Sequence, residues 1–166
     1  MSEMREHTGI ATGRLLDGAA SFHGHLGPYL VLGLRSGLIA VEVLGRDSGM
    51  SAIVETDRSP PRLCFIDGVQ FATGCTMGKG NIKMRAGKAI SATYVKGKKA
   101  LRVSVRSSVL EELNGRLLGG QIEKLALDLA DRSSDELFEV DYGEPSKFQM
   151  HTQPKTLTRL VGSCFF

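Results

Sequence analysis

Apolar positions recur along the chain at two spacings, which separate helical from extended segments. Residues 12–22 carry apolar side chains every three or four positions, which predicts a short amphipathic helix. Residues 28–44 begin with a proline and are apolar on nearly every side, which predicts a central buried helix. Gly33 and Gly37 share one face of that helix, where they would let another backbone approach closely.

The middle of the chain alternates between extended runs and a further helix. A β-branched run at 51–56 predicts a strand. Residues 62–73 predict a helix that Gly74 ends in a left-handed turn. Three strand-like runs follow, at residues 81–85, 89–95 and 100–106. The sequence KGKK between the last two predicts a hairpin.

The last third of the chain predicts helical pieces over residues 107–140 and an irregular end. Ser107 or Ser108 is the expected N-cap of the first piece, with Glu111 in capping-box position relative to Ser108. From Asp141 onward turn residues predominate, and we expect a closing strand or a tail. The element order predicts an α+β fold with a mixed β-sheet flanked by helices. At 166 residues, we expect residues 1–166 to form a single domain.

Composition changes this picture mainly by exclusion. The chain has 21 basic and 18 acidic residues, a formal charge of +3 that gives no argument for nucleic-acid binding. No run of about 18 apolar residues occurs, and residues 1–10 lack a signal-peptide layout, so we expect a cytoplasmic protein without a membrane span. The three cysteines, Cys64, Cys75 and Cys164, are an odd number and argue against a disulfide framework.

The glycine-rich stretch TGCTMGKGN, residues 73–81, has the composition of a phosphate-binding loop but not its spacing. A P-loop reads G-x-x-x-x-G-K-[ST], whereas Thr73 stands at the first glycine position and Gly80 follows Lys79. A helix also precedes the loop, and an extended run follows it. We interpret Cys75 as the informative residue instead, because a nearby lysine favours the thiolate, which binds metals and attacks substrates.

The stretch FHGHLGP, residues 22–28, places two histidines between two predicted helices. His23 and His25 are separated by a glycine and could converge on one metal, and histidine with cysteine favours zinc or another divalent transition metal. Asp67 and Gln70, three residues apart, share a face of the helix that leads to the glycine-rich loop. Asp67 is then either a solvent-facing acid, an acceptor that orients a metal-bound histidine, or a general base.

Together, FHGHLGPYLVLGLRSG and CFIDGVQFATGCTMGKGNI resemble the paired motifs of the FmdE family, named for a component of formylmethanofuran dehydrogenase. The motifs span residues 22–82, and the resemblance extends over most of the chain. It implies an α+β core with a thioredoxin-like arrangement, a homodimer, and a metal, zinc where seen, in the active site. The site residues that it implies are His23, His25 and Cys75 as metal ligands, Asp67 and Lys79 with Cys75 as catalytic groups, and Gln70 and Asn81 as cofactor-binding groups.

The sequence departs from the family pattern in two places. Many members continue into a cysteine-rich zinc finger, but only Cys164 occurs near the end here, so we expect the core domain alone. Many members also carry a cysteine where this chain has Gly27, which leaves a mixed His/Cys site with an open coordination position. His151 and Cys164 fit no metal-ligand spacing, and we expect structural roles for both.

Three functions remain as alternatives. One is a metal-dependent enzyme or oxidoreductase subunit linked to one-carbon metabolism, in which Lys79 and the loop N–H groups hold an anionic substrate. Another is an accessory protein that handles a metal or pterin cofactor without catalysis. The third is a thiol enzyme, with Cys75 as nucleophile and His23 or His25 as its base. We expect a second copy of the chain as partner, with a molybdenum or tungsten oxidoreductase as a further candidate.

Overall fold

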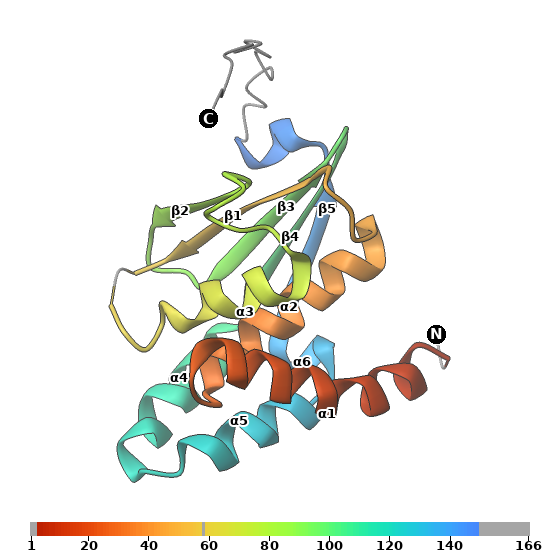
Figure 1. Ribbon diagram of the computed structural model, residues 1–166. Helices are drawn as coiled ribbons and strands as arrows, with labels where there is room; N and C mark the ends of the chain where they lie inside the picture. Colours follow the sequence, from red (N-terminus) through yellow and green to blue (C-terminus); the bar gives the residue numbers. More distant parts are fainter. Residues whose placement is uncertain (1–2, 58, 150–166) are drawn as a thin grey trace, which may run out of the picture.

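The computed structural model describes residues 3–57 and 59–149. Its helices are α1 (Glu3–His23), α2 (Pro28–Leu44), α3 (Cys64–Thr73), α4 (Ser107–Arg116), α5 (Ile122–Asp131) and α6 (Ser134–Leu137), with short 3-10 turns η1 (Leu117–Gly119) and η2 (Pro145–Phe148). Its strands are β1 (Met50–Thr56), β2 (Ile82–Ala86), β3 (Ser91–Lys96), β4 (Lys99–Val105) and β5 (Phe138–Gly143). The helices lie on one side of the sheet, with α2 and α3 nearest to it (Figure 1).

The five strands form one mixed sheet in the order β2-β1-β3-β4-β5. β1 and β2 are parallel and are connected through α3, and all other neighbours are antiparallel. Side chains on the helix side are buried and mostly apolar, including Ala52, Val54, Tyr94, Leu101 and Val103. This arrangement confirms the predicted α+β fold with a mixed sheet and helices packed against it.

α2 and α3 pack backbone against backbone, because glycines line their contact. A Cβ atom added at Gly33 would lie 2.0 Å from the Phe65 carbonyl oxygen, and one added at Gly68 would lie 2.2 Å from the Leu30 oxygen. At Gly37 the added atom would be 2.5 Å from the Ala72 Cβ. The predicted close approach at Gly33 and Gly37 is therefore confirmed.

The half-buried Arg35 of α2 ties this helix pair to α5. Its guanidinium donates to the carbonyl oxygens of Leu129, Ala130 and Arg132 and to Ser134 Oγ. The last carbonyls of a helix have no partner within the helix, so the guanidinium satisfies acceptors that would otherwise be left without donors. Burial lowers the pKa of Arg35.

Most predicted elements are confirmed, including the helix that ends at Gly74 with a φ of 71°. Two details were wrong. α4 has Arg106 in the N-cap position and no side-chain cap, so neither Ser107 nor Ser108 caps it. Phe138–Val140 belongs to strand β5 rather than to a helix, because it pairs with β4 along the sheet edge. Within the described residues, no helix is long and apolar enough to span a membrane.

Candidate functional site

His23 and Asp67 form the centre of the candidate site. His23 is the last residue of α1, and Gly24 turns the chain away with a φ of 104°. Asp67 lies in the first turn of α3. The His23 Nδ1 and Asp67 Oδ2 atoms are 2.6 Å apart, and the two side chains are 12% and 36% exposed. A partly buried carboxylate at this distance holds the imidazole in one orientation.

Gln70 fixes the carboxylate in turn. Its Nε2 donates to Asp67 Oδ1 over 3.3 Å, so both carboxylate oxygens have a donor. Its Oε1 accepts from the Met77 backbone N–H over 3.2 Å. The predicted common face of Asp67 and Gln70 is thereby confirmed, and a chain of contacts connects the glycine-rich loop to His23.

The second nitrogen of His23 is buried without a partner. In the tautomer whose Nδ1–H donates to the carboxylate, Nε2 carries the lone pair. Among the described residues, this Nε2 is the one buried side-chain nitrogen or oxygen that has no hydrogen-bond partner. Leaving such an atom unsatisfied costs about 1–3 kcal/mol. A carboxylate on one imidazole nitrogen and a free lone pair on the other is the usual arrangement of a metal-bound histidine.

His25 lies beside the His23 ring. The two imidazole centroids are 4.7 Å apart, with an angle of 44° between the ring planes. Gly27, the N-cap of α2, comes close to the second ring: a Cβ added there would lie 3.3 Å from His25 Nε2. The two rings are therefore neighbours, and their convergence on one metal stays a prediction.

Both packed helices begin at the histidine pair. α2 starts at Pro28 and α3 at Cys64, and neither N-terminus has a side-chain cap. The positive ends of two helix dipoles favour negative groups nearby, such as the Asp67 carboxylate in the first turn of α3.

Cys75 lies in a different environment, at the other end of α3. The residue is 1% exposed, and its thiol donates to the Met50 carbonyl oxygen over 3.5 Å. Burial raises the pKa of Cys75, and the hydrogen bond with Thr73 and the charge of Lys79 oppose this only in part. The expectation that Lys79 would favour a thiolate is thus corrected, because the desolvation of the sulfur outweighs the distant ammonium.

Asn81 serves the same part of the fold. Its side-chain oxygen accepts from the Thr76 N–H over 2.8 Å, and its Nδ2 donates to the Met50 carbonyl oxygen over 3.1 Å. Met50 therefore receives bonds from both Asn81 and Cys75, which fastens the glycine-rich loop to the start of β1. The geometry gives Asn81 a structural contact, and its contact with a cofactor stays a prediction.

The glycine-rich loop is not a phosphate cradle, as its spacing indicated. Most of its backbone N–H groups are bonded within the protein. The donors are Cys75, Thr76, Met77, Lys79 and Gly80. An anion would have to displace these bonds to reach the backbone, which contradicts the expected contribution of the loop N–H groups to anion binding.

The predicted ligands do not form one cluster. In the part of the chain that the structure describes, no three His, Cys, Asp or Glu side chains are grouped so as to hold a metal ion. His23, His25 and Asp67 lie together, whereas the Cys75 thiol is turned toward Met50. A three-ligand set of His23, His25 and Cys75 is therefore not assembled in this arrangement. His151 and Cys164 lie outside the described residues.

Cys64 is a thiol close to the site that sequence reasoning did not single out. It is three residues before Asp67 on α3 and half-buried. Burial and the negative charge of Asp67 raise the pKa of Cys64. The spacing of Cys64 and Asp67 on one helix face was the available signal.

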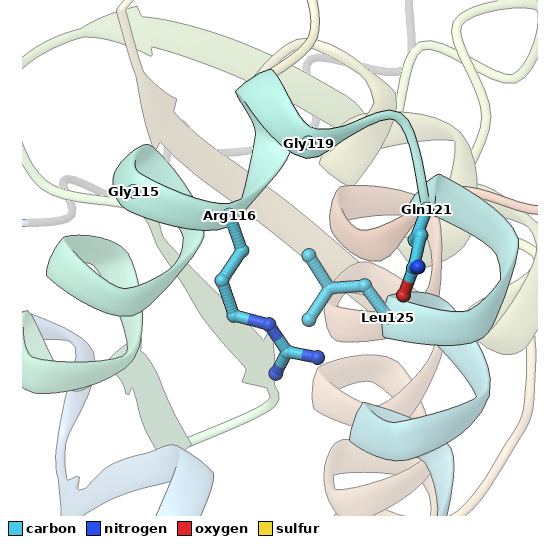
Figure 2. A pocket seen from close by; sticks show the side chains of 5 residues that line it. All are labelled: Gly115, Arg116, Gly119, Gln121 and Leu125. Atoms are coloured by element: carbon cyan, nitrogen blue, oxygen red, sulfur yellow. The ribbon is translucent and has the colours of Figure 1, made fainter.

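A separate hollow lies between α4 and α5, with a volume of about 270 Å³. It is lined by Gly115, Arg116, Gly119, Gln121 and Leu125 (Figure 2). The Arg116 guanidinium is already paired with Glu112 and Asp128, at 2.7 and 3.1 Å. Its charge is thus neutralised within the protein, and none of the predicted site residues lines this hollow.

Comparison with known proteins identifies the family of this chain. The sequence profile of a family described as "FmdE, Molybdenum formylmethanofuran dehydrogenase operon" matches residues 22–141, which include both histidines and the glycine-rich loop. This chain belongs to the FmdE family. The resemblance read from the two sequence motifs is therefore confirmed.

Two relatives show how far the similarity reaches. An FmdE-like protein of the tungsten formylmethanofuran dehydrogenase type, from Syntrophus aciditrophicus, has the same fold, with a TM-score of 0.61 and 19% identity over 87% of this chain and 78% of that chain. A probable S-adenosyl-L-methionine-binding protein from Archaeoglobus fulgidus is 40% identical over 104 residues. That match covers 57% of this chain but 27% of that protein, so the chain spans about a quarter of the relative.

Proposed function

We propose that this FmdE-family protein binds a divalent transition metal, zinc or a related ion, through the imidazoles of His23 and His25. The observation that carries the proposal is the buried His23 Nε2 without a partner, opposite an Nδ1 that is held 2.6 Å from Asp67. A metal ion would give that lone pair the partner it lacks. Neutral imidazoles are common ligands of zinc and its neighbours.

The residues around the pair have distinct roles in this proposal. His23 and His25 hold the ion, Asp67 keeps the His23 ring in its orientation, and Gln70 keeps Asp67 in place. Two imidazoles leave coordination positions open for water, substrate or a further ligand. When bound, such an ion supplies Lewis-acid polarisation of a carbonyl or activation of water.

The Cys75 thiol has no direct part in this site. A thiol that is 1% exposed, has a raised pKa and donates to the Met50 carbonyl oxygen is a poor nucleophile at neutral pH. The thiol-enzyme alternative therefore loses its main support, and we assign Cys75 to the fastening of the glycine-rich loop.

The wider role follows from the family. Its description refers to a molybdenum formylmethanofuran dehydrogenase operon, which supports a metal-dependent enzyme or enzyme subunit linked to one-carbon metabolism. A molybdenum or tungsten oxidoreductase is then the proposed partner, and a homodimer the proposed assembly. The alternative is an accessory protein that carries the metal or a pterin cofactor without turnover.

Metal analysis of the protein purified without added zinc tests the metal site. We expect about one divalent ion per chain in the wild type and in Cys75→Ser, and loss of the ion in His23→Ala and His25→Ala. Circular dichroism melting serves as the folding control for each variant. A full equivalent of metal in His23→Ala, or its loss in Cys75→Ser alone, would overturn the assignment. Turnover of a formyl-carrying substrate by the loaded protein then separates an enzyme from an accessory protein.

A further inference from the structure

Two positive side chains converge beside Gly74, at the end of α3 opposite the histidine pair. A Cβ atom added at Gly74 would lie 3.6 Å from Lys79 Nζ and 3.8 Å from an Arg46 guanidinium nitrogen. Arg46 comes from the loop after α2 and Lys79 from the glycine-rich loop, and both side chains are exposed. The two cations are therefore both close to the position of the Cβ atom that Gly74 lacks.

Neither cation is paired with an acidic side chain of the described residues. Across residues 3–57 and 59–149, no carboxylate oxygen lies within 4.0 Å of a side-chain nitrogen of Arg46 or Lys79, the distance that defines an ion pair. The nearest acid along the chain from Arg46 is Asp47, and that carboxylate is already paired with Lys96. Two like charges that share a point repel each other, and an anion between them would relieve the repulsion.

Helix capping does not account for the pair. Positive side chains often follow a helix because they bond its last carbonyls. Here the Gln70 carbonyl receives the Gly74 N–H at 2.9 Å, and the Leu44 carbonyl receives Lys96 Nζ at 2.7 Å. Neither Arg46 nor Lys79 donates to these carbonyls.

We infer that Arg46 and Lys79 form a binding site for an oxyanion, a phosphate or carboxylate group of a ligand. The planar guanidinium matches two oxygens of such a group, and the lysine adds a point charge. Recognition is by side chains, because the N–H groups of the loop are mostly bonded elsewhere.

The site has a defined relation to the histidine pair. Asp67 and Gly74 are seven residues apart on α3 and its cap, about 10 Å along the axis at 1.5 Å per residue. A ligand with an oxyanion at that distance from its metal-directed group would reach both sites. This reach rests on the proposed metal function, whereas the oxyanion site itself does not.

Titration of the full chain by nuclear magnetic resonance tests the site. The probes are inorganic phosphate and malonate, added at constant ionic strength while the amide signals of Gly74, Gly78 and Gly80 are followed. We expect saturable shifts with either probe, and an increase in Kd of about tenfold for Arg46→Gln and for Lys79→Gln, from the loss of one charged hydrogen bond. Tighter binding of phosphate would identify a phosphoryl ligand, and tighter binding of malonate a carboxylate ligand.

Lys98→Gln is the matched control, because it removes the same charge from the exposed β3–β4 turn. We expect its Kd to equal that of the wild type. Shifts that grow linearly without saturation, or equal Kd values in the Arg46, Lys79 and Lys98 variants, would overturn the site. Metal content is measured in a separate experiment. A negative oxyanion titration therefore does not contradict the histidine metal site, and a negative metal analysis does not contradict the oxyanion site.

Discussion

The two ends of the α2–α3 pair carry FHGHLGP and the glycine-rich loop, and they differ in how completely their polar groups are bonded. At the end where both helices begin, His23 is held by Asp67 and still presents a buried nitrogen without a partner. At the end where they finish, Cys75 and Asn81 both donate to Met50, and the loop N–H groups have internal acceptors. The glycine-rich loop has the more unusual composition, yet most of its N–H groups and the side chains of Cys75 and Asn81 are used to build the fold. An unsatisfied group is the better indicator of a ligand.

The largest expected effect, on the free energy of unfolding, comes from disrupting the close packing of α2 against α3. In Gly68→Ala the new Cβ would lie 2.2 Å from the Leu30 oxygen and 2.4 Å from the Leu34 nitrogen. Backbone atoms cannot yield as a flexible side chain can, so we expect a loss of more than about 3 kcal/mol in the free energy of unfolding. Urea denaturation measures it.

Gly115→Ala is the matched control for this change. Gly115 lies in α4 with nothing within 4 Å of the added Cβ. We expect it to be neutral or stabilising by up to about 1 kcal/mol, because alanine favours the helix over glycine. Equal stability of the two variants would contradict the close packing of α2 and α3.

A smaller change tests which end of α3 binds the metal without unfolding the protein. Asp67→Asn keeps the shape of the side chain but removes the charge that orients His23. We expect a loss of metal affinity of roughly 10–100-fold, the usual effect of altering the partner of a metal-bound histidine. Competition with a chelator measures the affinity. Cys75→Ser should retain the metal affinity of the wild type. An equal loss of metal affinity in Cys75→Ser would place the metal at the Cys75 end of α3 and contradict the assignment.

Gly27→Cys sharpens the comparison by adding a ligand. Gly27 has a φ of −133°, which any residue adopts, and its added Cβ would lie 3.3 Å from His25 Nε2. A thiolate there would supply the ligand that Cys75 does not, and we expect about tenfold tighter metal binding. Cobalt substitution would show a sulfur-to-metal charge-transfer band absent from the wild type. A spectrum without the band would mean that residue 27 does not face the metal.

The smallest expected effect is a difference in labelling rate between two thiols. Burial raises the pKa of both Cys64 and Cys75, so the thiolate fraction of each is low at neutral pH and rises as the pH approaches the raised values. Because Cys75 is buried and Cys64 half-buried, we expect iodoacetamide to label Cys64 first, in a Cys164→Ser background. Peptide mass spectrometry at neutral and at mildly alkaline pH measures the two rates. Rapid labelling of Cys75 at neutral pH would restore the thiol-enzyme alternative.

Local patterns were enough to predict most of the fold. The apolar run of α2 and the left-handed stop at Gly74 depend on neighbouring residues alone, and both were predicted correctly. The N-cap of α4 was not, because Arg106 takes that position although serines follow it. Strand β5 was predicted only in part, because its pairing with β4 is a non-local contact.

The candidate site was predictable in its residue types but not in its connections. The spacing of Asp67 and Gln70 gave their shared face, since about four residues make one helical turn. The sequence offered an acceptor for a histidine as only one of three roles for Asp67. The pairing of His23 with Asp67 joins residues 44 positions apart, and no local pattern selects it from the other two roles. Cys75 appeared reactive beside Lys79 because burial, which dominates its pKa, depends on contacts with distant segments such as β1.

Anomalous X-ray diffraction from crystals of the unsupplemented protein tests the metal assignment most directly. Data above and below the absorption edge of zinc and its neighbours both identify the ion and locate it. The account places the anomalous peak about 2.0–2.1 Å from His23 Nε2, the usual zinc–nitrogen distance, with His25 as the second ligand. A peak bonded to the Cys75 sulfur and distant from both imidazoles would contradict it.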